Sequence, residues 1–146
     1  MSFENAVIID AKGLILGRMA SIIAKRLLQG ETITIVNAEK AAISGIRLSR
    51  VRDAKTFLEV GHPRKGPYHP RRPDKIVRRT IRGMLPRKKP RGKQAFKRLK
   101  VYLDTPSELE DKGAQTLFEA SAERLKCPYV TVGEIAKEIG WASKGE

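Results

Sequence analysis

The sequence is poor in cysteine, in aromatic residues and in long apolar runs, and each shortage excludes a class of protein. Its single cysteine, Cys127, allows neither an intramolecular disulfide framework nor a zinc site built from several cysteines. Apolar stretches such as residues 7–9 and 14–16 fall far short of the ~20 residues that a membrane-spanning helix requires. No basic and then apolar signal pattern is present near the N-terminus. We therefore expect a soluble, intracellular protein.

Charge is abundant, and it is unevenly placed. The 146 residues hold 30 Lys and Arg against 16 Asp and Glu, a formal net charge of +14. Residues 62–100 contain 16 basic residues against one acidic residue, Asp74, whereas residues 1–61 contain nine against six and residues 101–146 five against nine. A chain of this length is expected to form a single domain over residues 1–146, with 62–100 as its basic segment and 101–146 as its acidic part.

The basic segment is also rich in proline. It holds six of the eight prolines, namely Pro63, Pro67, Pro70, Pro73, Pro86 and Pro90. Proline removes a backbone donor and blocks helix and sheet, so residues 62–72 and 86–93 are predicted to be extended loops. Closely spaced Lys and Arg repel one another unless a polyanion neutralises them, and solubility does not require so dense a charge. The segment therefore indicates nucleic-acid binding.

Hydrophobic periodicity predicts an α/β fold. A β-branched run at residues 6–10, a helix at 18–28 and a second strand at 32–36 are spaced as a right-handed βαβ unit. A loop is predicted at residues 40–45. Further helices are predicted at residues 46–60, 73–83, 94–98, 109–125 and from 132 onward, and further strands at 101–103 and 129–132. Thr131 and Glu134 are spaced as a capping box before the last helix.

The helix at residues 73–83 is the most informative element. Pro73 suits the first helical position, Asp74 suits the positive end of the helix, and Gly83 ends it. At about 100° per residue the helix has a cationic stripe and an apolar side. The stripe consists of Lys75, Arg78, Arg79 and Arg82, and the apolar side of Val77, Ile81, Met84 and Leu85. One face can pack on a core while the other meets an anion.

The residues give little support to a catalytic, metal or cofactor site. Gly13 and Gly17 lie between the first strand and the first helix, but GLILGR lacks the dinucleotide and P-loop patterns, so turn glycines are expected, with Gly17 near a backbone phosphate. His62 and His69 have no nearby residues that would complete a metal sphere. Cys127 lacks an activating histidine and is expected to be a small buried hydrophobe.

Three partners compete for the basic segment. DNA is a polyanion as RNA is, and composition does not separate them. A membrane surface would need aromatic residues on the apolar side of the 73–83 helix, which has none. RNA is favoured because rigid basic loops on an α/β body suit folded RNA, although an aromatic content of 5% argues against a stacking platform for single strands. A nucleotide-dependent enzyme and a regulatory RNA- or DNA-binding protein remain alternatives.

Four stretches resemble a known family: LGRMASIIAKRLLQGE, IVNAEKAAISG, GPYHPRRPDKIVRRTIRGMLPRK and RGKQAFKRLKVYLDTP. They are similar to the universal large-subunit ribosomal proteins of the L-thirteen family, in the archaeal and eukaryotic branch, over residues 7–141. The short tail favours an archaeal source. The resemblance implies a three-layer α/β/α fold around a small, mostly parallel four-stranded sheet with basic proline-rich extensions.

The resemblance also implies a function. A member of this family is a non-catalytic constituent of the large ribosomal subunit in the cytoplasm. It is expected to bind 23S-type ribosomal RNA early in assembly and to meet neighbouring large-subunit proteins, without a cofactor, a membrane or a small-molecule substrate. The acidic part, residues 101–146, is expected to face other ribosomal proteins or solvent.

Most of the expected RNA-binding residues belong to the basic segment. The strongest candidates are Arg71, Arg72, Arg78, Arg79 and Arg82, because guanidinium groups bind phosphates in bidentate fashion and stack on bases. Tyr68 and His69 would add stacking or hydroxyl contacts. Four second-tier candidates lie in or near the family's GR and NAEK stretches: Arg18, Lys40, Arg47 and Arg50. The remaining candidates are expected to supply charge that releases counterions, namely Arg64, Lys65, Lys75, Arg87, Lys88, Lys89, Arg91, Lys93, Lys97 and Arg98.

Overall fold

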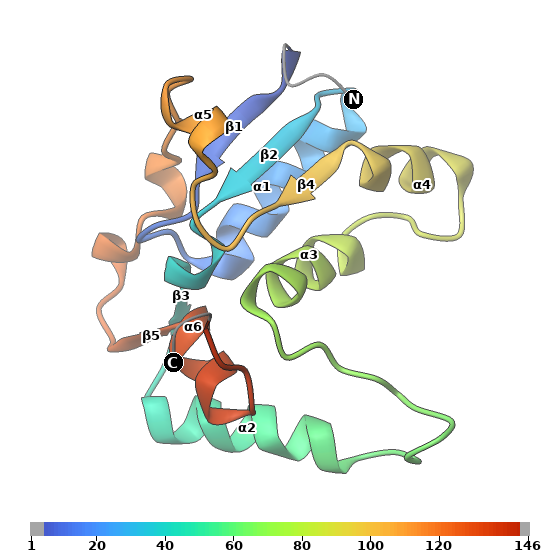
Figure 1. Cartoon of the computed structure of the whole chain (residues 1–146), viewed down its shortest axis with the longest axis vertical. Helices are drawn as coiled ribbons and strands as arrows, with labels where there is room; N and C mark the ends of the chain where they lie inside the picture. The colour runs from blue at the N-terminus through green and yellow to red at the C-terminus, as the bar shows by residue number, and fades with distance from the viewer. Residues whose placement is uncertain (1–4, 144–146) are drawn as a thin grey trace.

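The predicted βαβ unit is present in the computed structural model, which describes residues 5–143. β1 (Val7–Asp10) and β2 (Ile33–Val36) pair in parallel, and α1 (Leu16–Leu28) connects them. β4 (Leu99–Val101) pairs in parallel with the other edge of β2, so the sheet has the order β1-β2-β4 (Figure 1). The third strand begins two residues earlier than predicted because Leu99, which is buried, is the residue that reaches the core.

A second, smaller sheet is separate from the first. β3 (Ala42–Ser44) and β5 (Tyr129–Thr131) pair antiparallel. The prediction of one four-stranded sheet is therefore wrong in this detail: the part of the chain that the structure describes has three parallel strands and a two-stranded sheet. Residues 42–44 were predicted to be loop, because a three-residue strand is too short to show an alternating pattern.

The described residues contain five more α-helices and three 3-10 turns. The helices are α2 (Arg47–Glu59), α3 (Pro73–Gly83), α4 (Pro90–Lys97), α5 (Ser107–Glu110) and α6 (Val132–Glu138). The turns are Ala38–Lys40, Phe118–Ala120 and Ala122–Arg124. The prediction of an extended loop at residues 86–93 is wrong in its second half, because Pro90 occupies the first turn of α4, where no backbone donor is needed. No described helix is long and apolar enough to span a membrane.

The predicted helix at residues 109–125 does not form. α5 ends at Glu110, and Gly113 takes a φ of 66°. Beyond it, the chain pairs with the outer edge of β1: the Gln115 N–H donates to the Ile8 carbonyl at 2.8 Å, and the Gln115 carbonyl accepts from the Asp10 N–H at 2.9 Å. Backbone groups of a sheet edge need partners, and satisfying them here outweighs the local helical pattern.

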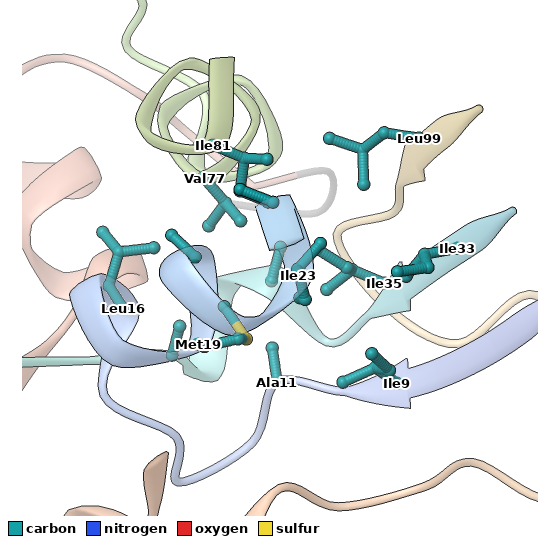
Figure 2. Close-up of a cluster of buried hydrophobic side chains, with 14 of the residues drawn as sticks. Ile9, Ala11, Leu16, Met19, Ile23, Ile33, Ile35, Val77, Ile81 and Leu99 are labelled. Atoms are coloured by element: carbon teal, nitrogen blue, oxygen red, sulfur yellow. The ribbon is translucent and has the colours of Figure 1, made fainter. Parts of the chain in front are cut away.

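The main core lies on one face of the parallel sheet. Ile9 and Ile35 of the strands and Ile23 of α1 are fully buried there. Figure 2 shows Val77 and Ile81 of α3 pointing toward α1 and completing this cluster. The apolar side of α3 is therefore fixed on the core, as its periodicity predicts.

The opposite face of the sheet is covered more thinly. Ile8 and Val36 pack there against Leu109 of α5, which lies in front of the sheet in Figure 1 while α1 lies behind it. The three-layer arrangement implied by the resemblance is thus present, with a four-residue helix as most of its second helical layer.

α2 lies at the end of the molecule away from the parallel sheet, beside α6 (Figure 1). None of its residues is fully buried, but its apolar residues Val51, Ala54 and Leu58 are half-buried. From α2 the chain runs through a long loop, residues 60–72, to α3. This loop, α3 and α4 lie on the same side of the molecule (Figure 1).

Candidate nucleic-acid interface

α3 has one buried face and one cationic face. Val77, Ile81 and Leu85 are buried. The four cationic residues of the predicted stripe are all exposed, namely Lys75, Arg78, Arg79 and Arg82. Met84 was predicted to face the core, but it is 43% exposed because it is the C-cap, where the helix ends.

An open groove of about 460 Å³ follows this cationic face, and we call it the basic groove. It is formed by the end of the loop before α3, by α3 and by α4. Its lining is Tyr68, His69, Pro70, Lys75, Arg78, Arg79, Arg82 and Phe96. Among the described residues, none that lines the groove is acidic. The groove thus combines four cations with three rings and has no carboxylate to neutralise them.

Two of the guanidinium groups are held by the protein itself. The Cζ atom of Arg78 lies over the ring of Phe96, 4.5 Å from its centroid. Nη1 of Arg79 donates a hydrogen bond to the main-chain carbonyl of Tyr68 at 2.7 Å. A cation held in this way loses less conformational entropy when it binds an anion.

The loop before α3 is ordered by its own contacts. His62 and Gly66 exchange two backbone hydrogen bonds of 2.9 Å, so residues 62–66 form a closed turn rather than the predicted extended loop. The hydroxyl of Tyr68 donates to the Arg64 carbonyl at 2.5 Å. The His69 ring lies 5.4 Å from the ring of Phe57 in α2. These contacts hold the loop against α2 and α3.

Gly61 permits this loop conformation. Its φ is +106°, and a Cβ at this position would lie 2.5 Å from Cδ of Pro67 and 2.6 Å from the carbonyl oxygen of Gly66. Any other residue would be strained and would push the closed turn away from α2.

A second hollow of about 470 Å³ shares Arg78 with the basic groove and extends the cationic surface toward β4. Lys97, Lys100 and Tyr102 also line it. Lys100 and Phe96 were absent from the predicted set. Both residues lie in the basic segment, and this position could have led to their prediction. Phe96 also directly precedes Lys97.

Several predicted candidates make contacts within the protein. Nη2 of Arg98 donates to the Leu27 carbonyl at 2.6 Å, at the negative end of α1. Nε of Arg72 lies 3.3 Å from Oδ1 of Asp74, the one carboxylate of the basic segment. Because Arg98 is half-buried, the structure does not bring it to the basic groove.

Two second-tier candidates likewise have protein partners. Nη2 of Arg47 lies 2.8 Å from Oε1 of Glu138 in α6. Nε of Arg50 donates to the Ser44 carbonyl at 2.7 Å, and its Nη1 lies 3.6 Å from Oδ2 of Asp53. Both side chains therefore connect α2 to neighbouring parts of the protein.

The other predicted cations are exposed at the protein surface. Arg71 lies against Gly140, beyond the end of α6, because a Cβ there would be 3.2 Å from its Nη1. The remaining exposed cations are Arg18, Lys40, Arg64, Lys65, Arg87, Lys88, Lys89, Arg91, Lys93 and Lys97. These side chains are accessible to a binding partner, and their role in RNA binding stays a prediction.

The residues considered for other chemistry take structural positions. Gly13 has a φ of 70° and serves a turn as predicted, but Gly17 lies inside α1, where a Cβ would meet no atom within 4 Å. At the carboxyl ends of β1 and β2, Nδ2 of Asn37 donates to Oδ1 of Asp10 at 3.0 Å. Residues 5–143 contain no group of three or more metal-ligating side chains.

The environment of Cys127 differs from the prediction. Cys127 is exposed, not buried. It belongs to an exposed stretch, residues 126–129, between the 3-10 turn Ala122–Arg124 and the buried Val130 of β5.

Comparison with known proteins assigns close relatives to the chain. A family model described as ribosomal protein L13 matches residues 4–108. The large ribosomal subunit protein uL13 of Methanosarcina barkeri is 50% identical over 135 residues, which cover 91% of this chain and 96% of the relative. The protein of the same name from Methanopyrus kandleri is 44% identical over 145 residues, 97% of this chain and 91% of the relative. That from Methanocaldococcus jannaschii is 46% identical over 138 residues, 91% and 96% of the two chains.

Proposed function

The chain belongs to the ribosomal protein L13 family, and from this premise we propose that this structural component of the large ribosomal subunit binds and stabilises the subunit's 23S-type RNA. The basic groove is the observation that supports RNA binding most directly. It presents four cations and three rings with no carboxylate among its lining residues. RNA supplies the phosphates and bases that such a surface can bind.

The division of the chain by charge supports the same proposal. We assign residues 62–100 to RNA and residues 101–146 to neighbouring ribosomal proteins or solvent, within one domain. The basic segment has 16 cations, and its single carboxylate, that of Asp74, is already paired with Arg72. The acidic part has five cations against nine acidic residues and would be repelled by phosphate.

Early participation in assembly is part of the proposal. The loop before α3 is held by contacts to α2 and α3 within the chain itself. A surface that is ordered before it meets RNA can bind without waiting for other proteins to shape it. We place the protein on the ribosome in the cytoplasm and assign it no catalytic activity, cofactor or small-molecule substrate, in keeping with relatives that are ribosomal structural proteins.

Sedimentation tests the ribosomal role. A lysate of the source organism is separated on sucrose gradients at moderate and at high salt, and the chain is followed by mass spectrometry. We expect it in stoichiometric amount with the large subunit at both salt concentrations, and also in the lighter precursor particles. If the chain stays at the top of both gradients, the ribosomal role is wrong. If it is present in mature subunits but absent from all precursors, early binding is wrong.

A further inference from the structure

We propose that the basic groove receives one unpaired nucleotide of folded RNA, with the base stacked on its aromatic side chains and the adjacent phosphates held by α3. The inference rests on the proposed function and specifies which part of the RNA the groove binds. The main observation that supports it is the position of Tyr68, His69 and Phe96 in one groove with four cations.

The chain concentrates scarce rings at this site. It has only three Tyr, four Phe and one Trp among 146 residues, yet a Tyr and a Phe line the basic groove together with one of its two His. A surface that bound only phosphates would need cations and no rings. Nucleobases that have left a duplex stack on rings and guanidinium planes, and this stacking is the common way in which proteins recognise unpaired RNA.

Tyr68 has the geometry of a stacking residue. Its side chain is 69% exposed, although a large ring is usually covered. Both ends of the residue are nevertheless fixed, because its hydroxyl donates to the Arg64 carbonyl and its main-chain carbonyl accepts from Arg79. The ring is thus exposed and held, and stacking a base on it costs little further ordering.

Arg78 provides a second prepared surface in the groove. Its guanidinium is held over Phe96, and Lys75 and Arg82 lie one turn to either side of it along α3. A guanidinium in this position can stack on a base or bind the phosphate next to it. Lys75 and Arg82 then supply charge for the phosphates on both sides.

The dimensions of the groove fit one nucleotide. Its volume, about 460 Å³, lies within the range of roughly 300–1,000 Å³ that small-molecule sites occupy. An A-form duplex keeps its bases stacked inside and presents mainly phosphates and 2′-hydroxyls, so it could use the cations of the groove but not the rings. An unpaired nucleotide can contact both the cations and the rings of the groove.

The test compares two RNA hairpins that differ by one nucleotide. Both have the same paired stem, closed by a flexible non-nucleotide linker so that no loop nucleotide is unpaired, and one carries a single 2-aminopurine bulge, whose fluorescence falls when the base stacks. We expect the complete protein at moderate salt to bind the bulged hairpin at least about 5-fold more tightly, because one base stack contributes roughly 1–3 kcal/mol. We also expect the fluorescence of the bulged base to fall on binding.

Three variants identify the groove as the site. Tyr68→Ala removes an exposed ring without opening the core, and we expect the preference for the bulge to disappear while binding to the paired hairpin is kept. Tyr68→Phe should retain most of the preference, since the ring remains. Tyr129→Ala is the matched control, because Tyr129 is also an exposed tyrosine, 51% exposed, but lies on β5.

The outcomes separate this inference from the proposed function. Equal affinity of the wild-type protein for both hairpins would overturn the nucleotide site and leave RNA binding intact. Failure to bind either hairpin at moderate salt would count against RNA binding itself. A preference that survives in Tyr68→Ala would place any unpaired base elsewhere and overturn the inference.

Discussion

Arginine side chains perform two different tasks in this protein, and their neighbours decide which. Arg98 donates to the carbonyl of Leu27, where it satisfies a main-chain acceptor at the end of α1. Arg78 and Arg79 are oriented toward solvent by Phe96 and by the Tyr68 carbonyl. The first kind of arginine stabilises the fold, and the second kind is prepared for an anion.

Reversal of the charge on two groove arginines should weaken RNA binding. In the double variant Arg78→Glu, Arg79→Glu, two phosphate contacts are lost, so the slope of log K against log salt should become shallower by about 1.4–1.8. Filter binding to large-subunit RNA measures this slope. The fold should remain, as circular dichroism can check, because both side chains are exposed.

A variant with the same charge change serves as control for this experiment. Arg124→Glu, Lys126→Glu alters two exposed cations in the acidic part of the chain. We expect its RNA affinity to stay much closer to that of the wild-type protein. If the two double variants lose equal affinity, net charge alone governs binding and the assignment to α3 is wrong.

Gly92 is required by the close approach of two backbone segments. It is buried in α4, and a Cβ there would lie 2.0 Å from the carbonyl oxygen of Pro86. We expect Gly92→Ala to destabilise the protein by about 2 kcal/mol or more in urea unfolding, at the upper end of ordinary overpacking, because backbone must move. Gly83→Ala is the matched control.

The control substitution should not lower the free energy of unfolding. A Cβ at Gly83 would meet no atom within 4 Å, and alanine favours the helix by roughly 0.5–1 kcal/mol over glycine. Gly83→Ala should therefore be neutral or slightly stabilising. Equal stability of the two variants would show that α4 does not pack against the segment at Pro86 as described.

Among the elements, α3 connects the core to the basic groove. Its buried residues Val77 and Ile81 contact the cluster around α1, and its exposed residues line the groove. The two faces follow from one helical period, so the packing of the apolar face fixes the direction in which the cations point. Stability and the proposed RNA binding are therefore linked through this helix.

Truncation of the apolar face of α3 tests its packing on the core. Ile81→Ala should lower the free energy of unfolding by about 2–5 kcal/mol, and Ile81→Val by about 0.5–1.5 kcal/mol, since Ile81 is fully buried. Met84→Ala, at the partly exposed C-cap, should cost less than the larger truncation at Ile81. Urea denaturation measures all three. The described packing would be contradicted if Ile81→Val lowered the free energy of unfolding by the roughly 2–5 kcal/mol expected for alanine. It would also be contradicted if Met84→Ala lowered it more than Ile81→Ala.

Across the whole molecule, the cationic charge is concentrated on one side. α3, α4 and the loop before α3 lie on one side in Figure 1, and the chain between α5 and β5 lies on the other. The first group belongs to the basic segment, whereas residues 111–128 hold three basic and three acidic residues. This distribution gives the protein one side suited to RNA.

The dependence of binding on salt measures how much of the basic side is used. If six to ten phosphates are neutralised, log K should fall with log salt with a slope between about −4 and −9, from about −0.7 to −0.9 for each contact. Titrations of large-subunit RNA at several salt concentrations give this slope. A slope no steeper than about −3.6 would mean that only the four cations of the basic groove, or some of them, meet phosphate.

Features that depend on neighbours in the sequence could be predicted. The capping box is one of them: the Glu134 N–H donates to Oγ1 of Thr131 at 3.2 Å, and the Thr131 N–H donates to Oε2 of Glu134 at 3.1 Å. The βαβ unit and the two faces of α3 are others, and their sequence patterns extend over one or two elements. The position of the cationic surface also followed from composition, because 16 cations lie within residues 62–100.

Features that depend on contacts between distant residues could not be predicted. The sequence near Gln115 looks helical, yet the exposed edge of β1 determines its conformation. Arg98 and Lys97 are adjacent cations, but one contacts Leu27 and the other lines the surface beside Arg78. Phe96 is a groove residue only because folding brings it beside Arg78 of α3.

The sequence by itself determined the parallel βαβ body, the amphipathic α3 and the location of the charge, because periodicity and composition act over short distances along the chain. Only the tertiary structure decided which cations contact protein, which remain exposed, and which rings lie beside the exposed cations. The physical reason is that hydrogen bonds and packing between segments far apart in sequence depend on where the backbone brings those segments. The four cations of α3 were visible in the sequence, and the basic groove that Tyr68 and Phe96 complete around them was formed by folding.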